Sequence, residues 1–405
     1  MKITAIISEY NPFHNGHKYL IDKARENGTT HCIAVMGGNF LQRGDCSIID
    51  KYSRAEMALC GGIDLVIELP QIYAAASAER FAFGAVDTII KCGCVDELAF
   101  GSECGDTELL TKAAEILDNH SEIQTLYKNF LKMGYSHPRA MQSAIEETVK
   151  NHDNISELLS KPNNILAIEY IKALRKSESK IDLFSVKRAG VFHNELETCG
   201  KLASASAIRE MVINKNNSYY KYIPDKSYEI LQNAIKDGRC PAESKNNERG
   251  ILSVLRSMSA DDFLQIPDVT EGLENRLIKA IKQNNSVPDI IMYVKSKRYT
   301  YARISRIITC AYLGINKEIA ALSPQYIRVL ALNGKGAEIL KVMKKTAELP
   351  LVMSPAKDIK KLDEKGKAIF ETDIRAADLH GLFTPQVQPC SLDFYSGVKF
   401  VGNIL

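Results

Sequence analysis

Two histidines stand close together near the start of the chain, in the stretch Ser-Glu-Tyr-Asn-Pro-Phe-His-Asn-Gly-His at 8–17. An apolar run at 3–7 precedes them and predicts a buried strand, and the pattern at 18–24 predicts a helix. The first turn of a helix presents unpaired N–H groups and the positive end of its dipole to an anion. His14 and His17 are therefore expected to donate hydrogen bonds to phosphate oxygens and to stabilise charge as pyrophosphate leaves.

Two other interpretations of this segment stay open. The histidines could cap the helix or lie on the surface, although the preceding strand and the Asn-Pro-Phe turn favour a ligand site. A zinc site would need further ligands, and no cysteine or carboxylate stands at zinc-ligand spacing from His14 and His17. No metal site is predicted. Gly16 lets the backbone approach a ligand closely.

Glycines and polar side chains also follow other predicted strands. The stretch 37–45, Gly-Gly-Asn-Phe-Leu-Gln-Arg-Gly-Asp, comes directly after the apolar run 33–36. Its glycines permit close approach of a ligand, and its arginine suits a phosphate or carboxylate. Gly101 and Arg188 each follow a further predicted strand, with an ordinary or solvated turn as the alternative. The candidates for contacting a substrate or phosphate in the first stretch are Gly38, Asn39, Gln42 and Arg43.

Two predicted helix starts carry polar side chains of the same kind. Pro162 and Asn163 open one helix, where the asparagine could cap the helix or bind a nucleotide. Ser204 and Ser206 open another, and Arg209 lies within its first turns. Hydroxyls and free N–H groups at a helix start suit a phosphate that the arginine can neutralise, with capping as the alternative.

The elements that must position these groups alternate along the first half of the chain. Strands and helices in alternation predict a doubly wound parallel sheet, an α/β fold in which ligands bind beyond the carboxyl ends of the strands. The candidate residues above fall at those ends. The predicted strands are 3–7, 33–36, 63–69, 95–100 and 181–186, and the predicted helices include 51–59 and 74–91.

The pattern changes after about residue 214, where helical periodicity dominates. The polar stretch at 214–218 suits a linker, which predicts a boundary near 214–224 between domains at 1–214 and 225–405, the second mainly α-helical. Its densest basic and aromatic segment is 295–306, suited to phosphates and an unpaired base, with a solvated amphipathic helix as the alternative. A second, weaker basic candidate is 341–345. The candidates for binding RNA are Lys295, Lys297, Arg298, Tyr299, Arg303 and Arg306.

Composition bounds the remaining choices. The 405 residues carry a net charge of +3, so any surface for nucleic acid must be a local basic patch. Ten cysteines without paired spacing are expected to be reduced thiols in a cytoplasmic protein. No signal peptide, membrane span or protein partner is predicted.

Several of these motifs together resemble a known family. His-Asn-Gly-His and Ser-Ala-Ser-Ala-Ile-Arg are similar to the paired motifs of the nucleotidyltransferase (HUP-like) superfamily, which transfers an adenylyl group from ATP. More closely, the chain resembles the bacterial tRNA(Met) cytidine acetate ligase family over nearly its whole length. The stretches that carry this resemblance are 8–17, 38–44, 100–103 and 162–166.

The resemblance implies an ATP-dependent ligase with ATP and acetate as substrates and Mg²⁺ accompanying ATP. Acetate would be activated as acetyl-adenylate, and the acetyl group would pass to N4 of the wobble cytidine of elongator tRNA(Met). His14 and His17 would be catalytic. One departure is Ala205, where the superfamily has a hydroxyl, which leaves the role of Ser204 open. The implied ATP contacts are Ile7, Ser8, Glu9, Tyr10, Asn11, Pro12, Phe13, His14, Asn15, Gly16, His17, Lys18, Tyr19, Leu20, Gly101, Asn163, Arg188, Ser206 and Arg209.

Two rival functions remain at this point. A small-molecule adenylyltransferase would not need the long basic and aromatic C-terminal region. A non-catalytic tRNA-binding protein would not need the histidine pair and Arg209.

Overall fold

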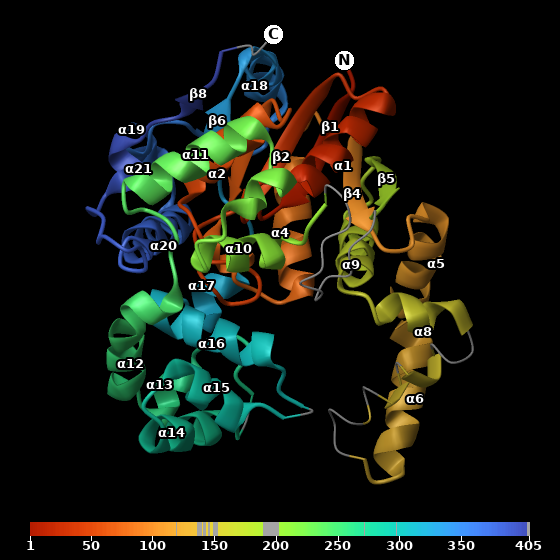
Figure 1. Cartoon of the computed structure of the whole chain (residues 1–405). Helices are drawn as coiled ribbons and strands as arrows, with labels where there is room; N and C mark the ends of the chain where they lie inside the picture. The colour runs from red at the N-terminus through yellow and green to blue at the C-terminus, as the bar shows by residue number, and fades with distance from the viewer. Residues whose placement is uncertain are drawn as a thin grey trace.

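A single mixed sheet forms the centre of the molecule (Figure 1). The computed structural model describes residues 1–118, 120–135, 140, 143–144, 146–148, 153–188, 202–270, 272–296 and 298–402. The strands follow one another across the sheet in the order β5-β4-β1-β2-β3-β6-β7, with β8 paired to β6. Their bounds are β1 Ile3–Ser8, β2 His31–Gly37, β3 Leu65–Leu69, β4 Glu97–Ser102, β5 Asp182–Lys187, β6 Ile327–Leu332, β7 Leu351–Val352 and β8 Lys399–Phe400.

The first five strands are parallel, which confirms the predicted doubly wound sheet. Every residue of β2 and β3 is buried, as expected for central strands covered on both faces. The predicted helix 74–91 is instead two helices, because the chain turns at 75–77. The helices of this half are α1 Asn15–Glu26, α2 Lys51–Cys60, α3 Gln71–Ala74, α4 Ala78–Lys91, α5 Thr107–Asp118, α6 His120–Lys132, α8 Asp153–Leu159, α9 Pro162–Lys176 and α10 Ala205–Ile213.

Two hydrophobic layers cover the sheet. Phe81 of α4 and Ile171 of α9 belong to the layer on one face. Ile21 of α1, Ala58 of α2 and Ile208 of α10 belong to the layer on the other. Helices α1 and α10 cover one face, and α4 and α9 cover the other. Residues of all four helices lie around the carboxyl ends of β1, β4 and β5.

The second half is mainly helical but also supplies strands β6, β7 and β8, which the sequence analysis missed. Strand β6 is fully buried and runs antiparallel to β3. None of the described helices combines the length and apolar character needed to cross a membrane. The helices are α11 Asp225–Lys236, α12 Glu248–Ser257, α13 Ala260–Leu264, α14 Leu273–Gln283, α15 Val287–Val294, α16 Tyr301–Leu313, α17 Lys317–Ala321, α18 Gly334–Thr346, α19 Pro355–Asp358, α20 Glu364–His380 and α21 Leu392–Tyr395, with short 3₁₀ turns at Asn217–Tyr222, Ser244–Asn247 and Ile359–Lys361.

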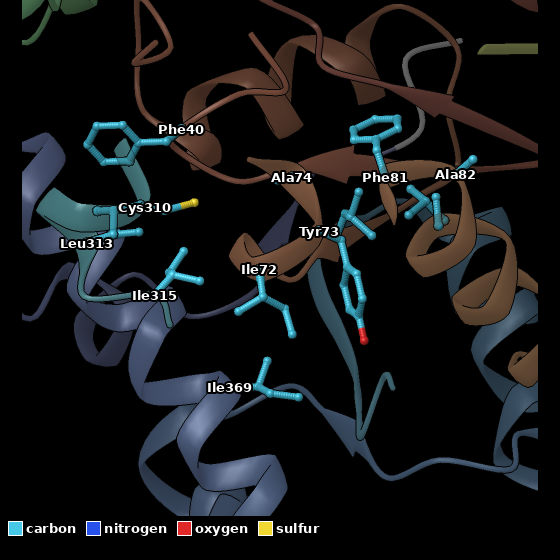
Figure 2. Packing of buried hydrophobic residues seen from close by; sticks show 14 of the residues in the cluster. Phe40, Ile72, Tyr73, Ala74, Phe81, Ala82, Cys310, Leu313, Ile315 and Ile369 are labelled. Carbon is cyan, nitrogen blue, oxygen red and sulfur yellow. The ribbon is translucent and has the colours of Figure 1, made fainter. Parts of the chain in front are cut away.

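The hydrophobic core continues from the first half of the chain into the second. Figure 2 shows Phe40 beside Cys310 and Leu313 of α16, and Ile72 of α3 above Ile369 of α20. These contacts fasten α16 and α20 to the loops that follow β2 and β3. The domain boundary at 214–224 stays a prediction.

A buried cluster of charges also joins the two halves. The ammonium group of Lys51 lies 2.8 Å from Glu68 and 3.0 Å from Asp393, and the guanidinium of Arg328 lies 3.0 Å from both carboxylates. The Tyr52 hydroxyl donates to Asp393 at 3.0 Å. Lys51 and Arg328 hold the pKa of Asp393 at about 2, although burial opposes this. The cluster is balanced, with two cations and two anions in water-excluded surroundings.

Replacing Asp393 by Asn leaves two buried cations facing one carboxylate. We expect this substitution to lower the free energy of unfolding by about 3–5 kcal/mol, because breaking a buried pair strands an uncompensated charge. Urea unfolding of D393N measures the loss. The matched control is D237N, since Asp237 is 56% exposed and pairs with Arg239 at the surface. Equal unfolding midpoints for the two variants would contradict this role of the cluster.

Candidate active site

A cavity of about 260 Å³ opens at the carboxyl ends of β1, β4 and β5. Most of the residues that the sequence singled out for nucleotide binding line it. Those lining residues are Ile7, Ser8, Glu9, Tyr10, Asn11, His14, Gly16, His17, Tyr19, Leu20, Gln42, Arg43, Gly101, Asn163, Arg188, Ser204, Ser206 and Arg209.

His14 and His17 form the first turn of α1 in a reciprocal cap. The His14 Nδ1 accepts a hydrogen bond from the Gly16 amide at 3.0 Å, and the His17 Nδ1 accepts one from the His14 amide at 3.2 Å. The two rings stack with their centroids 3.7 Å apart. Because each Nδ1 is an acceptor, each neutral ring carries its proton on Nε2. The two histidines therefore cap the helix, as one of the open alternatives predicted, and each still has an Nε2–H group that can donate to a ligand.

Both imidazoles are neutral near pH 7. Burial, followed by the charges of Arg188 and Arg209, lowers the pKa of His14 to about 3. Burial and the charge of His14 lower the pKa of His17 well below its ordinary value. The pair thus offers two neutral N–H donors next to fixed guanidinium charges, an arrangement that attracts a polyphosphate.

The start of α10 forms another wall of the cavity. Ser204 caps the helix, its hydroxyl accepting from the Ala207 amide at 3.1 Å. The Arg209 guanidinium donates to the main-chain oxygen of Asn11 at 2.9 Å and to the Ser206 hydroxyl at 3.1 Å. Arg209 is thereby held against the loop that carries the histidines. Ser204, whose role the sequence left open, holds the helix end toward the cavity.

The end of β4 is joined to α9 through Glu103. Its carboxylate accepts from the Asn163 side chain at 2.6 Å and from the Asn164 amide at 2.9 Å. Asn163 therefore lines the cavity with its side chain bound to Glu103, and it does not itself cap α9. The Arg188 side chain packs beside Gly101, since a Cβ atom on Gly101 would lie 3.4 Å from it.

Sequence analysis did not single out Arg54, which is fully buried behind the cavity. Its guanidinium donates to the main-chain oxygens of Glu9 at 2.6 Å and Gly37 at 3.0 Å, and also to that of Gly38. These bonds tie the loop after β1 to the loop after β2. Arg54 lies inside the predicted helix 51–59, and no local sequence pattern indicates that its side chain is buried.

The substrate candidates after β2 divide into two pairs. Gln42 and Arg43 line the cavity. Gly38 and Asn39 lie outside its lining, and their contact with a substrate stays a prediction. The Asn39 side chain instead accepts from the Lys51 amide at 2.8 Å and so fixes the start of α2.

Four residues of the implied ATP-binding segment also lie outside the lining. They serve the fold: Phe13 is fully buried against Gly61, and Lys18 pairs with Asp22 at 2.8 Å. The cavity also has an apolar wall of residues that were not predicted as contacts, and Lys187 lines it as well. The four residues outside the lining are Pro12, Phe13, Asn15 and Lys18, and the apolar lining residues include Phe81, Phe100, Leu166, Tyr170, Val186, Leu202 and Ala203.

The basic segment before and within α16 is only partly available to RNA. Lys295 and Arg298 are exposed, but Tyr299 is 7% exposed, with Arg298 above its ring at 5.2 Å. Arg303 donates to the main-chain oxygen of Asp268 at 2.7 Å, and Arg306 pairs with the Asp268 carboxylate at 3.2 Å. Tyr299, Arg303 and Arg306 thus make contacts within the protein, and their role in binding RNA stays a prediction. Lys297 lies outside the described residues.

The parallel sheet and the histidine loop at its edge define a nucleotidyltransferase. The family model described as HIGH Nucleotidyl Transferase matches residues 1–393. A relative from Thermoanaerobacter sp. (strain X514), named tRNA(Met) cytidine acetate ligase, is 42% identical over 401 residues, covering 97% of this chain and 98% of that protein. A relative of the same name from Thermosipho melanesiensis is 38% identical, covering 95% of each chain. The chain therefore belongs to the tRNA(Met) cytidine acetate ligase family.

Two solved structures agree with this result. The apo crystal structure of Thermotoga maritima TmcAL matches with a TM-score of 0.93 at 36% identity, over 100% of both chains. The structure of the same protein bound with alpha-thio ATP matches with a TM-score of 0.91, also at 36% identity and over 100% of both chains. The fold is thus shared with a protein that accommodates an ATP analogue.

The depressed histidine pKa values make stability depend on pH in a definite direction. Between the unfolded pKa of 6.5 and the folded value of about 3, the unfolded chain binds more protons at His14 than the folded one. The contribution of His14 to the free energy of unfolding is therefore undiminished above pH 6.5 and falls as the pH drops below it. We expect H14N to unfold with a weaker acid dependence, measured as urea midpoints from pH 7 to pH 5. An NMR titration of the His14 ring with a midpoint near 6.5 would contradict the account.

Proposed function

We propose that this protein is an ATP-dependent ligase that activates acetate as acetyl-adenylate and acetylates N4 of the wobble cytidine of elongator tRNA(Met), releasing AMP and pyrophosphate. The single observation that carries this proposal is the cavity, in which a neutral histidine pair and buried arginines meet at the end of a parallel sheet. The names of the relatives supply the substrates acetate and tRNA(Met).

The charges of the cavity support a binding position for ATP. His14, His17, Ser206 and Arg209 surround the position suited to the phosphates, because donors and a cation converge there. The base and ribose would lie along the ends of β4 and β5 beside Gly101, where no side chain intervenes. The segment from Ile7 to Leu20 would act as the ATP-binding loop.

The first reaction is an in-line attack. An acetate oxygen forms a bond to the α-phosphorus, and the bond to the pyrophosphate oxygen breaks with its electron pair. Negative charge then grows on the leaving group, where the two Nε2–H donors stabilise it more in the transition state than in bound ATP. Holding acetate and ATP in alignment lowers the remaining activation barrier, so this step needs no covalent nucleophile.

Mg²⁺ is expected to accompany ATP. The described residues hold no group of three His, Cys, Asp or Glu side chains that could bind a metal by themselves. Mg²⁺ commonly keeps several waters and binds through phosphates and one or two carboxylates, so it would enter with the nucleotide and neutralise phosphate charge. Because both ATP and tRNA are cytoplasmic molecules, we infer a cytoplasmic location. That no protein partner takes part remains a prediction.

Two substitutions of His14 separate its capping role from its donor role. Asn at this position can keep the cap through Oδ1 but loses the distal donor, whereas Gln keeps a distal N–H but loses the cap geometry. We expect H14N to lower acetate-dependent ATP–pyrophosphate exchange by about 10²–10³-fold, equivalent to about 2.7–4 kcal/mol. H14Q should retain more exchange. Near-unchanged exchange in H14N would contradict the role of the donor.

Acceptor binding is tested on the two exposed basic residues of the segment before α16. We expect K295E with R298E to weaken tRNA binding and to flatten its salt dependence, because phosphate contacts release counterions. Filter binding at several salt concentrations measures this, and acetate-dependent exchange without tRNA should stay unchanged. The control is K282E, a lysine on the exposed side of α14. Equal loss of exchange and binding would mean that the segment serves only the fold.

A further inference from the structure

The cavity contains one carboxylate, in the proposed ATP-binding loop, that the binding of phosphates does not explain. Among the described residues that line it, Glu9 is the only acidic side chain, against four cations. The charge of Glu9 acts on Arg54 and Arg209, where it opposes the lowering of their pKa values by burial. Because a carboxylate repels phosphates, a ligand that contacts Glu9 is expected to be a hydrogen-bond donor. The four cations are Arg43, Lys187, Arg188 and Arg209.

One oxygen of this carboxylate is held and the other is available. The Gln42 amide donates to the Glu9 Oε1 at 2.9 Å, and no described residue donates to Oε2. The main-chain oxygen of Glu9 is fixed by Arg54 at 2.6 Å. The side chain is therefore positioned by two neighbouring loops while keeping one acceptor for a ligand.

The surroundings of Glu9 lead toward the surface proposed for the acceptor. The loop that holds Oε1 packs on α16, where the hydroxyls of Ser305 and Thr309 donate to the main-chain oxygen of Gly44 at 2.6 and 2.8 Å. A Cβ atom on Gly44 would lie 2.3 Å from the main chain of α16, so this contact allows only glycine. The exposed basic residues Lys295 and Arg298 stand just before the same helix. The loop that holds Glu9 is therefore packed on the helix that follows these two exposed basic residues.

Aromatic rings complete this part of the cavity. Phe81 and Phe100 line it together with Tyr170, and the last two have ring centroids 6.2 Å apart. Flat apolar walls beside a carboxylate suit a planar base that bears an amino group. Carboxylates accept hydrogen bonds from the N4 amino group of cytosine in this way.

We propose that Glu9 binds the N4 amino group of the acceptor cytosine and takes its proton during acetyl transfer. The N4 electron pair forms a bond to the carbonyl carbon of acetyl-adenylate. The bond from that carbon to the phosphate oxygen breaks, AMP leaves with the electron pair, and the N4 proton passes to Glu9. This proposal rests on the proposed function, because acetyl-adenylate must first form in the same cavity.

The E9Q variant tests the proposal, since Gln keeps an oxygen for the Gln42 amide but cannot take the proton. We expect single-turnover acetyl transfer to tRNA to fall by about 10²–10³-fold, while acetate-dependent ATP–pyrophosphate exchange stays within about threefold. Hydroxylamine, a small nucleophile that does not need the cytosine site, should still yield acetohydroxamate at the normal rate. The control E26Q, at an exposed residue on α1, should leave both reactions unchanged.

The outcomes separate the two proposals. Unchanged transfer in E9Q, or an equal fall in exchange and transfer, would overturn the role of Glu9 and assign it to structure or to ATP. E9D, which keeps a carboxylate, should recover part of the transfer rate that E9Q loses. Absence of acetate-dependent exchange in the unsubstituted protein would overturn the proposed function, and the role of Glu9 with it.

Discussion

The site depends on one buried guanidinium, that of Arg54, which donates to main-chain oxygens at the ends of β1 and β2. Burial lowers its pKa to about 10, and it is still charged near pH 7. The carboxyl ends of parallel strands present carbonyl oxygens that a helix or a ligand must satisfy, and here a cation satisfies them. The loop after Glu9 and the loop after Gly37 are consequently held together. Side chains of both loops, including His14 and Arg43, line the cavity.

The fold keeps His14 and His17 neutral near pH 7 while each ring retains an N–H donor. Capping uses the inner nitrogen of each ring as an acceptor, while burial and the nearby arginines oppose the second protonation that would charge the ring. The positive charge for binding phosphates therefore comes from guanidinium groups such as Arg209, whose protonation does not change near neutral pH. His14 and His17 add directional hydrogen bonds at the place where charge develops. Positioning and electrostatics together suit a reaction that needs no covalent intermediate on the protein.

Much of the fold and site could be predicted from local signals. Apolar runs identified the five parallel strands, and the chemistry of helix starts identified His14, Ser206 and Arg209 as lining residues. Long-range choices could not be predicted. Strand β6 pairs with β3 because the chain returns to the sheet from the helical half. The Arg54 side chain points into the protein because it donates to main-chain oxygens that are distant in sequence. The local sequence did not indicate that Tyr299 is buried, because its burial depends on a neighbouring helix.

The most direct test of the central claim follows one oxygen atom. Acetate labelled with ¹⁸O in both carboxylate oxygens is incubated with ATP, tRNA(Met) and the protein, and the released AMP is analysed by mass spectrometry. If acetate attacks the α-phosphorus and the acetyl group then passes to the cytidine, each AMP carries one ¹⁸O. Unlabelled AMP alongside acetylated tRNA would contradict an acetyl-adenylate, and with it the reaction assigned to this cavity.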